Sequence, residues 1–256
     1  MDNNIYREII RLQDEGEEAA LATVTAVNGS TPREEGAKML IRADGSIMGS
    51  IGGGRIELEV IREAQEVIKR CRPKNLKYRL KEGEDLGMIC GGEADVFIEP
   101  IISSPNLFIL GGGHIALALA KMGQMLGFKV TVLDDRQEYA SAERFPEANK
   151  TIVSSYDTAF SKLNVGKNDY IVIVTEGHKG DADALEGALA TEAKYIGMIG
   201  SKAKNESVYN RLKAKGITQA QLERVHAPIG LPIHAQTPEE IAVSILAEII
   251  EVRRRQ

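Results

Sequence analysis

Two runs of three glycines are the residues of this chain most suited to binding chemistry. The first comprises Gly52, Gly53 and Gly54, and the second runs from Gly111 to Gly113. Each run follows an extended segment and precedes a helical pattern. Glycine lets the backbone turn tightly and approach a ligand, and the free N–H groups of a helix start attract negative charge. The two runs therefore predict two anion cradles. For the first run, the alternative is a tight strand-to-helix turn without a ligand.

The second glycine run lies in a pattern typical of dinucleotide-binding domains. The apolar stretch 106–110 leads into a G-x-G-x-x-A turn whose glycines are Gly111 and Gly113. After a helical stretch, a second apolar strand ends at Asp134, where an acid accepts hydrogen bonds from a ribose. We therefore expect NAD(P) or another nucleotide to bind here. The alternative is a Rossmann fold that keeps the turn for packing and binds no nucleotide.

Two histidines and an aspartate extend this predicted site. His114 begins the helix at the phosphate position, where its ring can donate to an anion, cap the helix or pack. His178 and Asp181 follow a strand that ends at Thr175, and strand ends form the ligand edge of an open α/β sheet. We expect both to contact the ligand. A polar lining is the alternative role for His178.

Three cations accompany the first glycine run, namely Arg33, Lys38 and Arg55. Guanidinium and ammonium groups form charge-assisted hydrogen bonds with phosphate or oxo groups. We expect these side chains to bind a negatively charged ligand together with the glycines. The alternatives are solvated surface charge and, for Arg33, a side chain that only fixes its own loop.

Cys90 is the candidate catalytic residue. Gly91 and Gly92 follow it, and a glycine-rich loop with exposed amides lowers the pKa of a thiol. A thiolate is a soft ligand suited to a metal or to sulfur transfer. The alternative is a small buried side chain, the commoner state of a free cysteine. The residue patterns predict no set of metal ligands.

Composition restricts the classes of protein that remain. The chain has 256 residues, is 43% hydrophobic and carries a net charge of −5, which argues against a general nucleic-acid surface. Its two cysteines fit a reducing compartment. The start lacks the features of a signal peptide, and no apolar run approaches the roughly 18 residues of a membrane span. We therefore expect a cytoplasmic protein that does not enter a membrane.

The elements that position these residues form two predicted domains. Residues 1–100 combine helical patterns at 4–14 and 57–69 with extended segments at 20–27, 38–41, 47–49 and 94–98, which indicates a small α+β domain. Residues 106–256 alternate buried strands with helices, which predicts an α/β domain of the Rossmann type with a doubly wound parallel sheet. The proline-containing segment Pro100 to Pro105 is the expected boundary.

Several motifs together resemble the xanthine dehydrogenase accessory proteins of the XdhC/CoxI family. In the first half these are the segments 27–39, 49–54 and 87–92. In the second half they are the segments 111–114, 134–136, 197–202, 227–231 and 237–243. The resemblance covers about residues 19–253. Two positions depart from the family pattern: Arg55 stands where a cysteine is usual, and the T-H-D-H-x-x-D segment reads Thr175–Glu176–Gly177–His178–Lys179–Gly180–Asp181.

The resemblance implies a maturation factor that binds molybdenum cofactor, assists its sulfuration and delivers it to a xanthine dehydrogenase-type molybdenum hydroxylase. It also implies a cysteine desulfurase as a further partner and a homodimer. Two other functions use the same dinucleotide motif: an NAD(P)-dependent oxidoreductase and a nucleotide-sensing regulator. The first is disfavoured because no Tyr–Lys, Cys–His or metal-ligand set accompanies the fingerprint.

Overall fold

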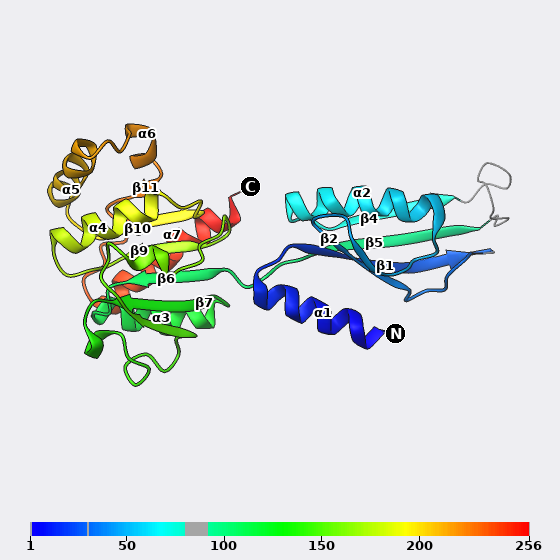
Figure 1. Cartoon of the computed structure of the whole chain (residues 1–256), viewed down its shortest axis with the longest axis horizontal. Helices are drawn as coiled ribbons and strands as arrows, with labels where there is room; N and C mark the ends of the chain where they lie inside the picture. The colour runs from blue at the N-terminus through cyan, green and yellow to red at the C-terminus, as the bar shows by residue number, and fades with distance from the viewer. Residues whose placement is uncertain (1, 30, 80–91, 256) are drawn as a thin grey trace. The chain divides into compact units, whose positions relative to one another are not determined.

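The computed structural model describes residues 2–29, 31–79 and 92–255, and Figure 1 shows its helices and strands. The chain divides into two compact units between Ser104 and Pro105. Each unit has its own sheet and its own hydrophobic core.

The N-terminal unit is built on a five-stranded antiparallel sheet. Its strands lie in the order β3-β2-β1-β5-β4. The elements in chain order are α1 (Asp2–Glu15), β1 (Ala19–Asn28), β2 (Lys38–Arg42), β3 (Ile47–Gly49), α2 (Gly54–Arg70), β4 (Lys74–Arg79) and β5 (Glu93–Ile101). Strands that alternate in burial on two faces need a cover on each face, and two helices provide it.

The helices α1 and α2 lie on opposite faces of this sheet (Figure 1). Buried residues of α2, including Val60 and Ala64, pack against one set of alternate strand residues such as Ala22. Buried residues of α1, including Leu12, pack against the other set, such as Leu40. The alternation of the strands thus supplies one small core on each side of the sheet.

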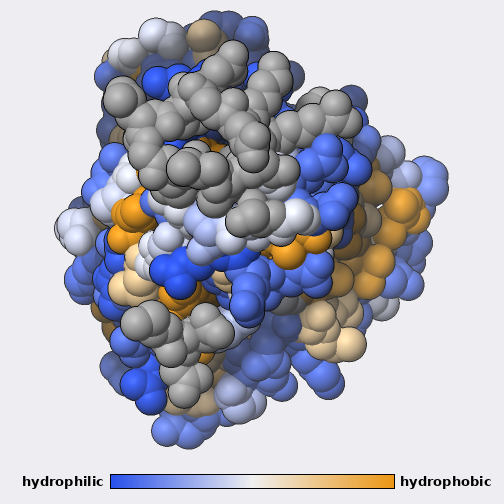
Figure 2. All heavy atoms as spheres, turned by 90° about the vertical axis from the view of Figure 1, so that its right-hand side faces the viewer, coloured by the Kyte–Doolittle hydropathy of each residue, from blue (hydrophilic) through white to orange (hydrophobic). Residues whose placement is uncertain are grey.

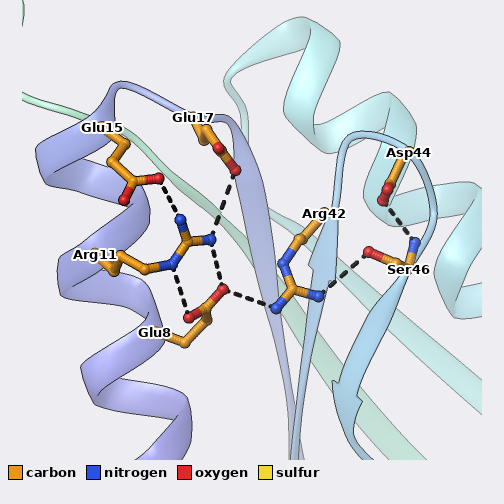
Figure 3. Close-up of polar contacts among 7 residues, drawn as sticks. All are labelled: Glu8, Arg11, Glu15, Glu17, Arg42, Asp44 and Ser46. Carbon is orange, nitrogen blue, oxygen red and sulfur yellow. Dashed lines mark hydrogen bonds and ion pairs between the residues drawn. The ribbon is translucent and has the colours of Figure 1, made fainter.

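A polar network attaches α1 to the β2–β3 hairpin (Figure 3). Arg11 donates two hydrogen bonds to the Glu8 carboxylate, at 3.0 and 2.8 Å, and Arg42 of β2 donates a third at 2.8 Å. Arg11 also pairs with Glu15, and Arg42 also donates to Ser46 in the hairpin. The hydrogen bonds from Arg11 and Arg42 lower the pKa of Glu8 to about 2.

The C-terminal unit is built on a six-stranded parallel sheet with the order β11-β10-β9-β6-β7-β8. Counted from β6, this is the strand order 3-2-1-4-5-6 of dinucleotide-binding domains. The elements are β6 (Asn106–Leu110), α3 (His114–Met125), β7 (Lys129–Asp134), η1 (Gln137–Tyr139), β8 (Lys150–Val153), η2 (Ala159–Ser161), β9 (Tyr170–Ile173), α4 (His178–Leu189), β10 (Tyr195–Met198), α5 (Lys202–Ala214), α6 (Gln219–Leu222), β11 (Val225–His226) and α7 (Pro238–Arg254).

Helices cover both faces of the parallel sheet. Leu107 and Ile109 of β6 pack in the core formed with α3 and α7, whereas Phe108 and Leu110 pack in the core formed with α4 and α5. Because alternate residues of one strand enter different cores, both faces of that strand are buried. This confirms the predicted fold, a small α+β domain followed by a doubly wound Rossmann-type domain.

Some elements differ from the sequence expectations. The strand β4 was not predicted, because its residues KNLKYR alternate only weakly in polarity. The strand β5 extends to Ile101, so Pro100 lies inside a strand and not in a linker. Proline is tolerated there because β4 pairs only with residues up to Ile98, which leaves β5 with a single neighbour at Pro100.

The described surface is mostly polar on the face that Figure 2 shows. Hydrophilic residues surround small, separate apolar patches, a distribution that is usual for protein surfaces. In the part of the chain that the structure describes, no helix has the length and apolar character needed to cross a bilayer.

The Glu8 network predicts a pH-dependent contribution to stability. Because the pKa of Glu8 is lowered in the folded state, the ionised carboxylate stabilises the fold above its ordinary pKa, and this contribution is lost as the pH falls from about 4.5 to about 2. We expect Glu8→Gln to lower the urea midpoint at pH 7. The difference between the two proteins should shrink steadily below pH 4.5.

The matched control is Glu15→Gln, because Glu15 contacts Arg11 from a more exposed position and is not bonded to Arg42. At pH 7 it should change the midpoint less than Glu8→Gln. Equal effects of the two substitutions, or a Glu8→Gln difference that persists at pH 2, would show that the network does not act through the Glu8 charge.

Candidate ligand-binding site

The loops that carry most of the family-like motifs meet at one edge of the parallel sheet. The carboxyl ends of parallel strands lie at the same edge, and ligands of open α/β sheets bind there. The glycine run follows β6, the segment from Asp134 to Arg136 follows β7, and the segment from Thr175 follows β9. The glycine run and the end of β9 are in direct contact, since a Cβ atom at Gly111 would lie 2.4 Å from the Val174 carbonyl oxygen.

The three glycines of this turn differ in backbone conformation and in the space around them. Gly111 has a φ of +107°, which favours glycine. A Cβ atom at Gly112 would lie 1.8 Å from the carbonyl oxygen of Tyr139, so the η1 segment passes directly over the turn. A Cβ atom at Gly113 would have nothing within 4 Å. Open space therefore lies beside Gly113, which precedes α3.

The start of α3 offers backbone donors to an anion. Gly113 is the N-cap residue, and among the described residues no side chain caps the helix there. His114, the first helical residue, is exposed. Uncapped N–H groups at a helix start favour negatively charged ligands. Gly111, Gly113 and His114 are thus placed together as the sequence predicted, and their contact with a ligand stays a prediction.

Asp134 is fully buried, and its carboxylate accepts hydrogen bonds from other residues of the protein. Its Oδ2 atom accepts hydrogen bonds from the Gly112 amide at 2.7 Å and from the Tyr156 hydroxyl at 3.2 Å. Its Oδ1 atom accepts from the amide and the Nε atom of Arg136, both at 3.0 Å. Burial raises the pKa of Asp134, but the bonds from Arg136 and Gly112 outweigh it and the pKa is lowered. A ribose hydroxyl would have to compete with these donors, so ribose binding stays a prediction.

Arginines that the sequence analysis did not single out surround the turn. Arg136 reaches from the end of β7 to Glu176 after β9, with 2.6 Å between Nη1 and Oε2. Its guanidinium carbon lies 3.8 Å from the centroid of the Tyr139 ring. The Nε atom of Arg144 donates to the Gly112 carbonyl at 3.0 Å, and its guanidinium carbon lies 4.9 Å from the centroid of the Tyr139 ring. No sequence signal marked Arg144, since its hydrogen bond to Gly112 joins residues that are 32 positions apart in the chain.

Asp181 is also buried and has protein partners. The Thr175 hydroxyl donates to its Oδ1 atom at 2.6 Å, and Lys204 of α5 pairs with its Oδ2 atom. Asp181 therefore links the end of β9 to α5, and a role in ligand binding stays a prediction. The side chain of His178 lies outside the described residues, although its backbone begins α4.

The first glycine run holds a carboxylate of the chain itself. The Oε1 atom of Glu57 accepts from the Ser50 hydroxyl at 2.6 Å, the Gly53 amide at 2.9 Å and the Ile51 amide at 3.1 Å. Burial opposes ionisation of Glu57, but these hydrogen bonds prevail and lower its pKa. The Gly53 amide of the run, together with Ser50 and Ile51 before it, thus holds the Glu57 carboxylate, and binding of an external anion by this run stays a prediction.

The predicted cations of the N-terminal unit make local contacts. Arg33 is exposed, and the Lys38 ammonium donates to the Gly36 carbonyl at 3.2 Å. Arg55 is 65% exposed and pairs with Glu59 at 3.1 Å. A Cβ atom at Gly52 would lie 2.7 Å from the ring of Pro32, so the loop of Arg33 lies beside the glycine run. Gly54, the last residue of that run, begins α2. Ligand binding by these residues stays a prediction.

The predicted catalytic residue, Cys90, lies outside the described residues, as does Gly91. Gly92 is buried and directly precedes β5, whose first residue Glu93 pairs with Asn28 and Arg79. Within the described ranges, no group of three or more histidine, cysteine and acidic side chains is arranged to hold a metal ion.

Comparison with known families agrees with this arrangement. Residues 107–249 match the family model described as the XdhC Rossmann domain, and residues 12–79 match the model described as the XdhC and CoxI family. The chain belongs to the XdhC family. The resemblance seen in the motifs is therefore confirmed, and the family's Rossmann domain coincides with the parallel sheet described above.

Three relatives align with nearly the whole chain. The uncharacterized protein YqeB of Escherichia coli K12 is 35% identical over 98% of this chain, which spans 46% of that relative's length. A protein of Bacillus subtilis 168 that is named as a probable xanthine dehydrogenase subunit is 24% identical over 98% of both chains. The molybdenum cofactor insertion chaperone PaoD of Escherichia coli K12 is 23% identical over 98% of this chain and 90% of that protein.

One solved structure has a similar fold across both units. It is described as a xanthine dehydrogenase from Bacillus halodurans and is 23% identical to this chain. The alignment covers 98% of this chain and 96% of that one, with a TM-score of 0.55. At this level of identity the similarity concerns the fold alone.

The glycine turn after β6 yields a stability prediction. Gly112→Ala places a methyl group against the Tyr139 carbonyl, so the η1 segment must move, and we expect a loss of about 1–3 kcal/mol. Gly113→Ala meets open space at a φ of −72° and should cost less than about 1 kcal/mol. Urea denaturation followed by circular dichroism measures both. Equal losses would contradict the assigned packing of η1 on the turn.

Proposed function

We propose that this XdhC family member is a maturation factor that binds molybdenum cofactor, assists its sulfuration and helps insert it into a xanthine dehydrogenase-type molybdenum hydroxylase. The observation that carries the proposal is the alignment of nearly the whole chain with a protein named as a molybdenum cofactor insertion chaperone. Membership of the XdhC family supports it. The proposal includes a cysteine desulfurase as the source of sulfur and a homodimeric state.

The geometry of the C-terminal unit supports a carrier that binds its cargo by polar contacts. Molybdenum cofactor is a flat pterin with a dithiolene-bound metal and a phosphate. The uncapped start of α3 supplies donors that suit a phosphate. Arg144, held by the Gly112 carbonyl, places a guanidinium group at the same turn. These groups bind and orient an anion and need no nucleophile or metal of the protein.

A nucleotide is a second candidate ligand for the same turn. The strand order is that of dinucleotide-binding domains, and the space beside Gly113 allows the close approach that a pyrophosphate requires. This supports NAD(P) or another nucleotide as a ligand of the Rossmann unit. A nucleotide-sensing regulator or an NAD(P)-dependent oxidoreductase would use the same contact.

The maturation function is tested with purified molybdenum cofactor and an apo-hydroxylase. We expect about one cofactor bound per chain and slower oxidation of the bound cofactor than of free cofactor. Cys90→Ser should retain binding but lose activation of the hydroxylase, because a hydroxyl group lacks the softness of a thiolate. The control is Cys71→Ser, since Cys71 is exposed at the end of α2. Equal decay of free and protein-mixed cofactor would refute the proposal.

The nucleotide candidate is tested by calorimetric titration with NADH, NADPH, ATP and CTP. Gly113→Ala fills the open space at the turn, so it should weaken binding at least about tenfold, or about 1.4 kcal/mol. Gly166→Ala is the matched control, because its Cβ atom would make only an ordinary contact, 3.6 Å from Asp169. If no nucleotide binds, or if Gly113→Ala binds like the unsubstituted protein, the turn is not a nucleotide site.

A further inference from the structure

A cavity of about 490 Å³ opens at the carboxyl edge of the parallel sheet. Its walls come from the ends of β7, β8 and β9 and from the first turns of α4, and they include Asp135, Tyr156, Glu176 and Asp183. This volume lies in the range of small-molecule sites, and the position is where open α/β sheets bind ligands. Of the ligand contacts predicted from the sequence, none whose side chain the structure describes lines this cavity.

The charge of the cavity selects the kind of ligand. Among the described residues, the lining carries four carboxylates, from Asp135, Asp157, Glu176 and Asp183, and one guanidinium, from Arg136. An anionic group would be repelled, whereas N–H donors would find acceptors. Within the described residues, acidic side chains form no group arranged to hold a metal ion. The cavity therefore suits an organic ligand with several N–H groups.

Asp135 is the carboxylate with most freedom to accept such donors. The Oε2 atom of Glu176 accepts a hydrogen bond from Nη1 of Arg136 at 2.6 Å. The Oδ1 atom of Asp183 accepts one from Nη2 of Arg211 at 3.2 Å. Asp135 is 52% exposed, and its nearest ion-pair partner is the Nε atom of Arg136 at 3.7 Å. Burial and the neighbouring Asp134 raise the pKa of Asp135. A ligand that donates to this carboxylate would relieve the repulsion between the two acids.

The cavity also has a fixed aromatic wall. Tyr156 is 8% exposed, and its hydroxyl is anchored by the hydrogen bond to Asp134. Gly180 of α4 lets this ring approach the helix closely, since a Cβ atom there would lie 3.2 Å from the ring. Aromatic walls favour flat rings, which pack against them.

The geometry points to a binding site for a 2-amino-4-oxopyrimidine ring, the edge that pterins and guanine share, with Asp135 accepting its two adjacent N–H groups. Those two donors lie side by side like the donors of a guanidinium, and a carboxylate accepts such a pair in bidentate fashion. Tyr156 forms the wall beside the ring. The inference rests on the proposed function, because the organic part of molybdenum cofactor is a pterin. It assigns the pterin to the Rossmann unit and not to the first glycine run, where the Gly53 amide already donates a hydrogen bond to Glu57.

The test is a fluorescence titration of the full chain with pterin at neutral pH, with guanosine as a competitor. Lumazine is the ligand control, because a carbonyl oxygen replaces the 2-amino group. We expect pterin to bind at least tenfold more tightly than lumazine. Asp135→Asn should weaken pterin binding at least tenfold and abolish that preference. Glu138→Gln, in the exposed η1 segment and outside the cavity lining, should leave both unchanged.

Each outcome decides the inference. Tighter binding of pterin than of guanosine supports the cofactor as the source of the ring, and the reverse supports a guanine nucleotide. Equal binding of pterin and lumazine, or unchanged binding by a folded Asp135→Asn protein, would overturn the inference. The proposed function would still stand if that protein protects molybdenum cofactor normally. Failure of the unsubstituted protein to protect cofactor refutes the function separately.

Discussion

The buried carboxylate of Asp134 is the contact on which the C-terminal site depends. It joins the glycine turn after β6 to Arg136 after β7 and to Tyr156 after β8. Arg136 in turn reaches Glu176 beyond β9 and supports the Tyr139 ring. A carboxylate that is buried with its hydrogen bonds satisfied fixes the groups around it, because each broken contact would leave an unpaired buried charge. One side chain thus sets the relative positions of the loops at three strand ends.

In each glycine run, a backbone amide donates a hydrogen bond to an acidic side chain of its own unit. In the N-terminal unit Glu57 accepts the amides of Ile51 and Gly53, and in the C-terminal unit Asp134 accepts the amide of Gly112. Oriented backbone amides attract an anion, and a carboxylate of the chain is always available at high local concentration. Around the second run, donors for an external anion remain at the start of α3 and on Arg144.

Periodicity was sufficient to predict most strands of the two sheets and the type of the second domain, although it missed β4. The apolar runs at β6, β7 and β9 are short and buried on both faces, which is typical of parallel strands covered by helices. The site was only partly predictable. The position of Asp134 at the end of its strand suggested a ribose acceptor, and only the fold reveals that Arg136 and Tyr156 donate hydrogen bonds to it. Nothing local marks Arg144 or the Tyr139 carbonyl, whose contacts span about 30 residues of chain.

The open edges of the two sheets bear on how the protein behaves at high concentration. An edge strand exposes unpaired N–H and C=O groups that can recruit a strand from another molecule and begin aggregation. Here β3 has three residues, β11 has two and β8 has four, so none of them offers a long template. The longer edge strand β4 carries Lys74 and Lys77, whose charges repel a second copy of the same edge. Short or cationic edges thus let each sheet keep exposed margins and still resist association into fibrils.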